Sequence, residues 1–256
     1  MPAGKSRAQP LRGSLSEQAY QSVRRMILRG ELLPGAALSR REVARELGMS
    51  LLPISEAFQR LEHDGLLESW PRVGTRGRVP TQQDVRGNYV IREALESQSA
   101  RLFAEKASPS EKEEMIRMAA EVDAMHRDAR VASFDYFSAH ERLHRRIAEC
   151  AGCPALVEAI EKSSILIRTW QYTAISDFRD DPSHYHQHLL EALCSGSVEE
   201  ADRVMREHVR YGINEVLRRM EPYFRGEYHS HTGIAIGSGG GGPRPGHAKE
   251  SNACSA

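Results

Sequence analysis

The sequence lacks long apolar runs and carries no net charge. No stretch approaches the roughly 18 consecutive apolar residues that a membrane-spanning helix needs. With 40% hydrophobic and 27% charged residues, the composition is that of a soluble globular protein rather than a disordered chain. Residues 1–13 contain basic side chains without an apolar core behind them, so we expect no secretory signal. The expected location is the cytoplasm, with no membrane partner.

Cysteine is also scarce. The four residues are Cys150, Cys153, Cys194 and Cys254. Cys150 and Cys153 have the spacing of a metal or redox pair, but no second pair of this kind accompanies them. Free thiols in a cytoplasmic protein are the simpler interpretation.

The zero net charge conceals an uneven distribution. Residues 1–80 contain 13 Lys and Arg against 8 Asp and Glu, whereas residues 81–256 contain 22 against 27. Because electrostatic potential acts domain by domain, the first third could face nucleic-acid phosphates. The length of 256 residues also suits two domains better than one helical core.

The first 80 residues predict a short helical domain that ends in a hairpin. Helical spacing of apolar residues begins after Ser14, a second helix runs over Ser39–Leu47, and a third follows Ser50 as N-cap. Leu66–Trp70 and Arg76–Val79 are predicted strands joined by a basic tip. Helix, helix, turn, helix and hairpin is the order of a winged helix-turn-helix.

After Pro80 the pattern is helical throughout. We predict helices over 82–107, 110–129, 133–151, 154–178, 183–195 and 198–221, separated by Gly and Pro punctuation. The fold class is therefore mainly α, a winged helix-turn-helix followed by an antiparallel all-α bundle. The expected organisation is a disordered arm (1–13), a DNA-binding domain (14–80), a helical effector and dimerisation domain (81–225) and a disordered Gly-rich tail (226–256).

The N-terminal segment resembles the winged-helix domain of the GntR family. The resemblance lies in the Gly30–Leu38 turn, in Arg41-Glu-Val-Ala44, in the Pro53 helix with Glu56-Ala57, and in the Leu61–Leu66 junction. It implies that the third helix enters the major groove of double-stranded DNA, while the hairpin approaches the minor groove or backbone. The residues expected at this surface are Arg41, Ser50, Leu51, Ser55, Gln59, Arg60, Arg72, Gly74 and Thr75.

The sequence departs from the family at the start of this helix. Leu51 and Ser55 stand where the family usually has two arginines, and Arg40 replaces a common Glu. Because Arg is the usual bidentate partner of guanine, we expect an operator unlike the common one, or weak binding. Ser55, Gln59 and Arg60 are the candidate base readers, with Arg41 and Arg72 on phosphates. The alternative is that Gln59 and Arg60 only solvate the helix.

Histidine spacing predicts a shared site in the bundle. His140 and His144 lie one turn apart on one helix face. His186 precedes the Gly196 turn by ten residues and His208 follows it by twelve, so an antiparallel hairpin would bring them to about the same height. The four rings could converge on a metal, but they could also be hydrogen-bonded core or surface histidines.

The C-terminal part resembles the FCD effector domain of the FadR subfamily, in its shorter, six-helix variant. The matching stretches are Ile91–Glu96, Leu143–Ala148, His186–Leu193 and Met205–His208. The resemblance implies a divalent metal held by one Asp and three His. His144, His186 and His208 occupy the His positions, and His140 stands in place of the Asp. Four imidazoles favour Zn, Ni or Fe over Mn or Mg, and they leave occupancy open.

The resemblance also implies a small organic acid as effector. Arg92, Arg168 and Tyr172 are the residues expected to hold its carboxylate. An alternative for Arg92 is a salt bridge to Glu96, four residues on. The expected function is a homodimeric, ligand-responsive transcriptional regulator, most simply a repressor, and not an enzyme. The competing interpretations are a metal-dependent enzyme and a DNA-binding protein whose effector site has degenerated.

Overall fold

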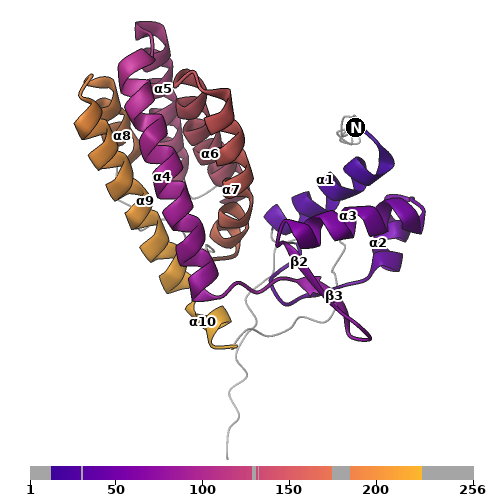
Figure 1. The fold of residues 1–256 in the computed structure, drawn as a ribbon. Coiled ribbons are helices and arrows are strands. Elements are labelled where there is room, and N and C mark those ends of the chain that lie inside the picture. The colour runs from indigo at the N-terminus through magenta and orange to yellow at the C-terminus, as the bar shows by residue number, and fades with distance from the viewer. Residues whose placement is uncertain (1–12, 30, 129–130, 132, 175–184, 227–256) are drawn as a thin grey trace, which may run out of the picture.

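The protein has a small head and a larger helical bundle (Figure 1). The computed structural model describes residues 13–226 except 30, 129, 130, 132 and 175–184. The expected terminal arm and tail therefore lie almost wholly outside the described residues. None of the described helices is long and apolar enough to cross a membrane.

The head contains three helices and a small sheet. Its elements are α1 (Leu15–Leu28), β1 (Ala37–Leu38), α2 (Arg40–Leu47), α3 (Leu51–His63), β2 (Leu67–Trp70) and β3 (Gly74–Gly77). The side chains of Ser14 and Ser39 accept backbone N–H bonds at the starts of α1 and α2, which satisfies donors that a helix leaves unpaired. Ser50 is the N-cap of α3, but its side chain makes no capping bond.

The hairpin is tighter than the sequence predicts. The sheet has the antiparallel order β1-β3-β2, and Trp70 pairs with Gly74. The second strand thus begins two residues before the predicted Arg76, because Arg72 and Gly74 adopt positive φ and reverse the chain early. β1 was not predicted, since two residues are too few to show an alternating pattern. Gly77 lies against the backbone of Leu33, where a Cβ would come within 2.6 Å of the carbonyl oxygen.

All regular secondary structure in the described C-terminal part is helical. They are α4 (Gln82–Lys106), α5 (Pro109–Arg127), α6 (Ser133–Cys150), α7 (Pro154–Ala174), α8 (Tyr185–Cys194), α9 (Val198–Arg219) and α10 (Glu221–Phe224). Six of them match the predicted helices within a few residues at each described end. The short α10 was not predicted, because Pro222 sits in its first turn and interrupts the helical pattern.

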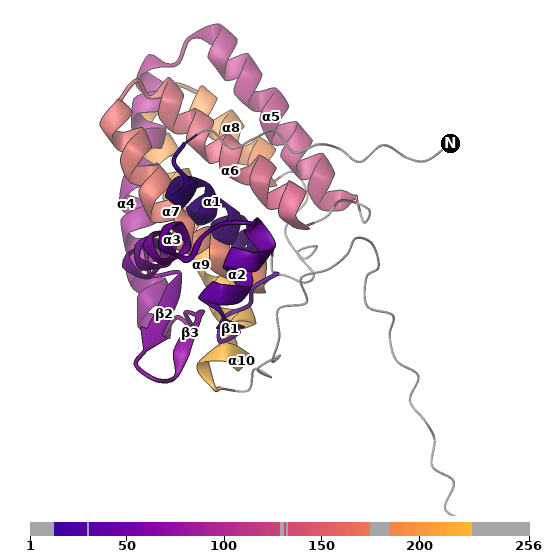
Figure 2. The ribbon, with the colours of Figure 1, turned by 90° about the vertical axis from the view of Figure 1, so that its right-hand side faces the viewer.

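Each part has its own apolar core. One cluster joins residues of α1, α2, α3 and the sheet, and the other joins residues of α4 to α9. Leu166 on α7 packs against both clusters. Figure 2 shows α1 and α3 in front of α7, and α1 and α7 are in contact. The head therefore rests on a helix that also belongs to the bundle core.

Candidate functional site

Four buried histidines meet inside the bundle. His140 and His144 come from α6, His186 from α8 and His208 from α9, and all are between 2% and 9% exposed. The ring of His140 lies 4.5 Å from that of His144, 5.0 Å from that of His186 and 6.0 Å from that of His208, centroid to centroid. The spacing along α6 and the level positions on α8 and α9 thus bring these rings together.

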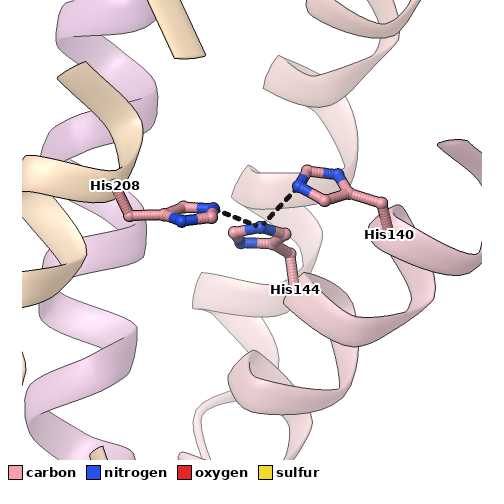
Figure 3. A group of neighbouring side chains, drawn as sticks. All are labelled: His140, His144 and His208. Carbon is pink, nitrogen blue, oxygen red and sulfur yellow. Dashed lines mark hydrogen bonds between the residues drawn. The ribbon is translucent and has the colours of Figure 1, made fainter. Parts of the chain in front are cut away.

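Three of these rings present nitrogen atoms to one point (Figure 3). Nε2 of His144 lies 3.2 Å from Nε2 of His140 and 3.2 Å from Nε2 of His208. Nitrogens at about 2.0–2.1 Å from a tetrahedral metal are roughly 3.3 Å apart. Two of the three separations among these ligand atoms are therefore nearly those that a first-row metal requires, and the third is within 4.8 Å.

Acidic side chains orient two of the rings from behind. Oε2 of Glu96 lies 2.6 Å from Nδ1 of His144, and Oε1 of the same carboxylate accepts a 2.7 Å bond from Nε of Arg92. Oδ1 of Asp123 lies 2.7 Å from Nδ1 of His186. Such contacts place the proton on Nδ1 and leave the Nε2 lone pair facing the cluster.

Burial, more than the neighbouring charges, keeps the imidazoles of His140, His144 and His208 neutral. Burial lowers the pKa of His140 and of His208 well below the usual value, and the neighbouring histidines lower it further. Burial alone would raise the pKa of Glu96, but Arg92 and His144 bring it down to about 2. The cluster therefore combines neutral nitrogen ligands with ionised carboxylates, which is the state that metal binding needs.

The donor set fits a divalent metal. His140, His144 and His208 form a group of potential ligands whose nitrogen atoms lie within 4.8 Å of one another. Nε2 of His186 and Nδ1 of His208 are buried without a hydrogen-bond partner among the described residues, and buried polar atoms seldom stay unpaired. His186 lies outside the group of three, but its unpaired Nε2 is placed to serve as a fourth ligand. Asp135, on the same helix, is exposed.

The CxxC pair takes no part in this cluster. Cys150 and Cys153 are free thiols, and burial raises the pKa of Cys150 to about 11. A thiol with so high a pKa is a poor nucleophile and a poor metal ligand at neutral pH.

Two small cavities adjoin the histidines. A cavity of about 60 Å³ is lined by Arg92, His140, His186 and His208 together with tyrosines of α6, α8 and α9, and Arg219 closes one wall. A second, of about 20 Å³, lies beside Glu96 and His144. Arg92 lines both cavities, but its guanidinium already pairs with Glu96, the alternative raised from the sequence. The side chains of Arg168 and Tyr172 lie outside the described residues.

Most of the expected DNA-contacting residues lie at the surface of the head. Exposed side chains or backbone occur at Arg41, Ser50, Leu51, Gln59, Arg72 and Gly74, and Ser55 is half-buried. Arg41 and Arg72 have no ion pair or hydrogen bond among the described residues, so their charges are available for phosphate groups.

Two expected contacts are placed differently. Thr75 is only 5% exposed, and its hydroxyl lies 2.6 Å from that of Ser69, so it supports the hairpin from within. Arg60 forms an ion pair with Glu17 and lies 3.9 Å from the centre of the Tyr20 ring. Its guanidinium is therefore directed at α1, because position 60 lies on the flank of α3.

Sequence reasoning missed several residues of both sites. Leu52 and Val73 are 69% and 81% exposed at the start of α3 and at the hairpin tip, a feature that periodicity does not separate from ordinary surface positions. Asp123 is buried in the last turns of α5 and meets α8, although nothing in its local sequence marks it as a partner of His186.

Comparison with known proteins assigns a family to each part. The model of bacterial regulatory proteins of the gntR family matches residues 15–76, and the FCD domain matches residues 88–211. A probable D-xylose utilization operon transcriptional repressor of Paenarthrobacter nicotinovorans is 31% identical over 77% of this chain and 87% of its own length. The HTH-type transcriptional repressor RspR of Escherichia coli K12 is 24% identical over 80% and 90%.

Solved structures show the same fold. McbR/YncC of E. coli has a TM-score of 0.66 at 20% identity, covering 82% of this chain and all of that one. A putative GntR regulator from Rhodococcus sp. RHA1 has a TM-score of 0.67 at 21% identity, covering 80% and 99%. These findings agree with one another: two family models match in the expected order, one relative is more than 30% identical, and the fold is that of GntR regulators. The chain therefore belongs to the GntR family of DNA-binding transcriptional regulators with an FCD domain, which is a family of regulators and not of enzymes.

Proposed function

We propose that this regulator is a metal-dependent, ligand-responsive repressor. The observation that carries the proposal is the convergence of Nε2 of His140, His144 and His208 at the centre of the bundle. A buried cluster of neutral imidazoles has little use as packing, since each unpaired nitrogen costs desolvation free energy. A metal among the rings would take up the unpaired Nε2 of His186 together with the Nε2 atoms of the other three histidines.

The proposed metal is of the Zn, Ni or Fe class. His140, His144 and His208 would be the ligands, with His186 as the fourth. An all-nitrogen set lacks the hard oxygen ligands that Mg and Mn prefer. Because neutral imidazoles leave the double positive charge of the ion uncompensated within the first shell, the site would attract an anion.

The proposed effector is a small organic acid in the cavity beside the histidines. Arg92 and Arg219 line that cavity together with Glu215, which pairs with Arg219 at 3.1 Å, so the positive charge that attracts the acid would come from the metal. Arg92 is balanced by Glu96, so it would add a directed donor rather than a free charge. One relative is named for D-xylose utilization, and sugar acids therefore belong among the candidates to test.

The proposed output is a change in operator affinity. As a homodimer in the cytoplasm, the protein would place two copies of α3 in neighbouring major grooves of a near-palindromic operator. Ser55 and Gln59 would contact bases, while Arg41 and Arg72 would contact phosphates. Effector binding would favour one orientation of the heads over another and so alter DNA affinity by linkage.

Metal analysis tests the first half of the proposal. Freshly purified protein is expected to contain about one first-row metal per chain, and chelation is expected to lower the melting temperature, since a ligand of the folded state stabilises it. His144→Ala is expected to lose the metal, whereas His188→Ala, which alters an exposed histidine of α8, is expected to keep it. Absence of metal together with no effect of chelation would contradict the proposal.

A panel of small acids tests the second half. The metal-loaded protein is expected to gain melting temperature with at least one carboxylate or sugar acid, and the same compound is expected to release operator DNA. If the metal is present but no acid shifts either measurement, the chain is better described as a DNA-binding protein with a degenerate effector site.

A further inference from the structure

Exposed apolar side chains gather on the parts of the head that face DNA. Eight large hydrophobic residues of the described chain are exposed, and four of them lie on α3 or the hairpin. These are Leu51, Leu52, Trp70 and Val73, at 50%, 69%, 39% and 81% exposure. Single exposed leucines are normal, but two in succession at the start of a recognition helix are a concentrated apolar surface.

Leu52 projects from the outer face of α3. The helix buries Ile54, Ala57, Phe58 and Leu61. Because successive residues are turned by about 100°, position 52 points away from that buried stripe, as position 59 does. The N-terminal residues of a recognition helix are the ones that reach base edges in the major groove. Leu52 therefore occupies a position from which a base would be contacted.

Three arginines on or near α3 pair with carboxylates, whereas Arg41 and Arg72, which have no such partner among the described residues, are the proposed phosphate contacts. Arg60 is the only Lys or Arg in α3, and it pairs with Glu17. Arg40 pairs with Glu62, and Arg76 pairs with Glu68. These contacts leave the outer face of α3 with leucines, a serine, a glutamate and a glutamine.

We infer that Leu52, with Leu51 beside it, reads the C5-methyl groups of thymine in the major groove, a role that rests on the proposed use of α3 as the recognition helix. Thymine is the base that presents a methyl group there, and apolar side chains contact it. Gln59 on the same face matches adenine, to which glutamine can bond through both N6 and N7. The half-site contacted by α3 is therefore rich in A·T pairs rather than in guanine.

Replacement of thymine by deoxyuridine removes only the methyl group, which makes the inference directly testable. The full-length, metal-loaded protein first selects duplexes from a random pool. The selected duplex is then resynthesised with deoxyuridine at one thymine at a time. Affinity is measured for the wild type, for Leu52→Ala and for Val90→Ala. Val90 lies on α4 of the bundle and is 69% exposed, the same fraction as Leu52, so it is a matched control.

The expected result is position-specific. At one or two thymines per half-site, deoxyuridine weakens binding of the wild type and of Val90→Ala about fourfold, the factor that corresponds to one buried methyl group. At the same thymines, deoxyuridine leaves the affinity of Leu52→Ala unchanged, because that variant has already lost the contact with the methyl group. Equal sensitivity of Leu52→Ala and the wild type, or insensitivity at every thymine, would overturn the inference while operator binding stands. Failure to enrich any duplex would overturn operator binding as well.

Discussion

Oε2 of Glu96 lies 2.6 Å from Nδ1 of His144, while Oε1 of the same carboxylate accepts a bond from Arg92. One buried carboxylate thus fixes the tautomer of a central histidine and balances the charge of an arginine beside the cavity. The proposed metal and effector sites share this group, so a change at Glu96 reaches both.

Glu96→Gln is expected to weaken metal binding. The amide cannot carry the negative charge that raises the basicity of His144, and loss of such a supporting partner typically costs about 10- to 100-fold in metal affinity. Competition with a fluorescent chelator measures the change. Glu93→Gln is the control, because Glu93 lies on the same helix but pairs with Arg206 and Arg210 outside the cluster. Equal affinities in the two variants would contradict the supporting role of Glu96.

Glu96→Gln also leaves the buried Arg92 without its counter-charge, and breaking a buried pair destabilises a protein by about 3–5 kcal/mol. Melting curves of the metal-free variants separate that effect from metal affinity. A variant that folds, melts lower and still binds metal as tightly as the wild type would count against the prediction.

His140→Asp is expected to change which metal the site prefers. A carboxylate ligand is hard and anionic, so it improves the site for Mn relative to the all-imidazole wild type, while Zn affinity changes less. Competition between Mn and Zn in equilibrium dialysis gives the ratio of affinities. Asp135→His tests position rather than composition: residue 135 is exposed, and its substitution is expected to leave the ratio unchanged.

Local chemistry explains why much of the fold could be predicted. The starts of the first three helices, near Ser14, Ser39 and Ser50, could be predicted because apolar spacing and capping preference depend on a few neighbouring residues. The histidine cluster could be predicted from the sequence because a helix fixes the spacing of His140 and His144. Asp123 was not predictable: it lies 63 residues before His186, and only tertiary packing of α5 on α8 brings the two together. The burial of Thr75 was not predictable either, since it depends on the register of β2 and β3.

Phosphate contacts predict a graded response to salt. Arg41→Ala and Arg72→Ala are each expected to weaken binding to all sequences about equally and to reduce the slope of log affinity against log salt by about 1, since each removes one phosphate contact. Arg60→Ala is the control. The guanidinium of Arg60 is held by Glu17, so the slope for this variant is expected to match that of the wild type. Titrations of labelled operator at several salt concentrations provide the slopes; a reduced slope for Arg60→Ala alone would reverse the assignment.

The junction between head and bundle predicts a pH-dependent stability. Asp84 accepts bonds from the backbone and hydroxyl of Thr81 and pairs with Arg78 at 3.0 Å. Burial raises the pKa of Asp84, but these hydrogen bonds and Arg78 outweigh it, so the folded-state pKa is below the usual value of 3.8.

Because the folded pKa is depressed, the contribution of Asp84 is fully present above the unfolded pKa and is lost as the pH falls through the folded pKa. Asp84→Ala is therefore expected to cost about 1 kcal/mol at neutral pH, the typical value of a helix cap, and progressively less below pH 4. Urea unfolding at several pH values measures the difference. Glu121→Ala, at an exposed position within α5, is the control. A loss for Asp84→Ala that stayed constant down to pH 2 would mean that the carboxylate charge does not contribute, and that only the packing of the side chain holds α4 to the head.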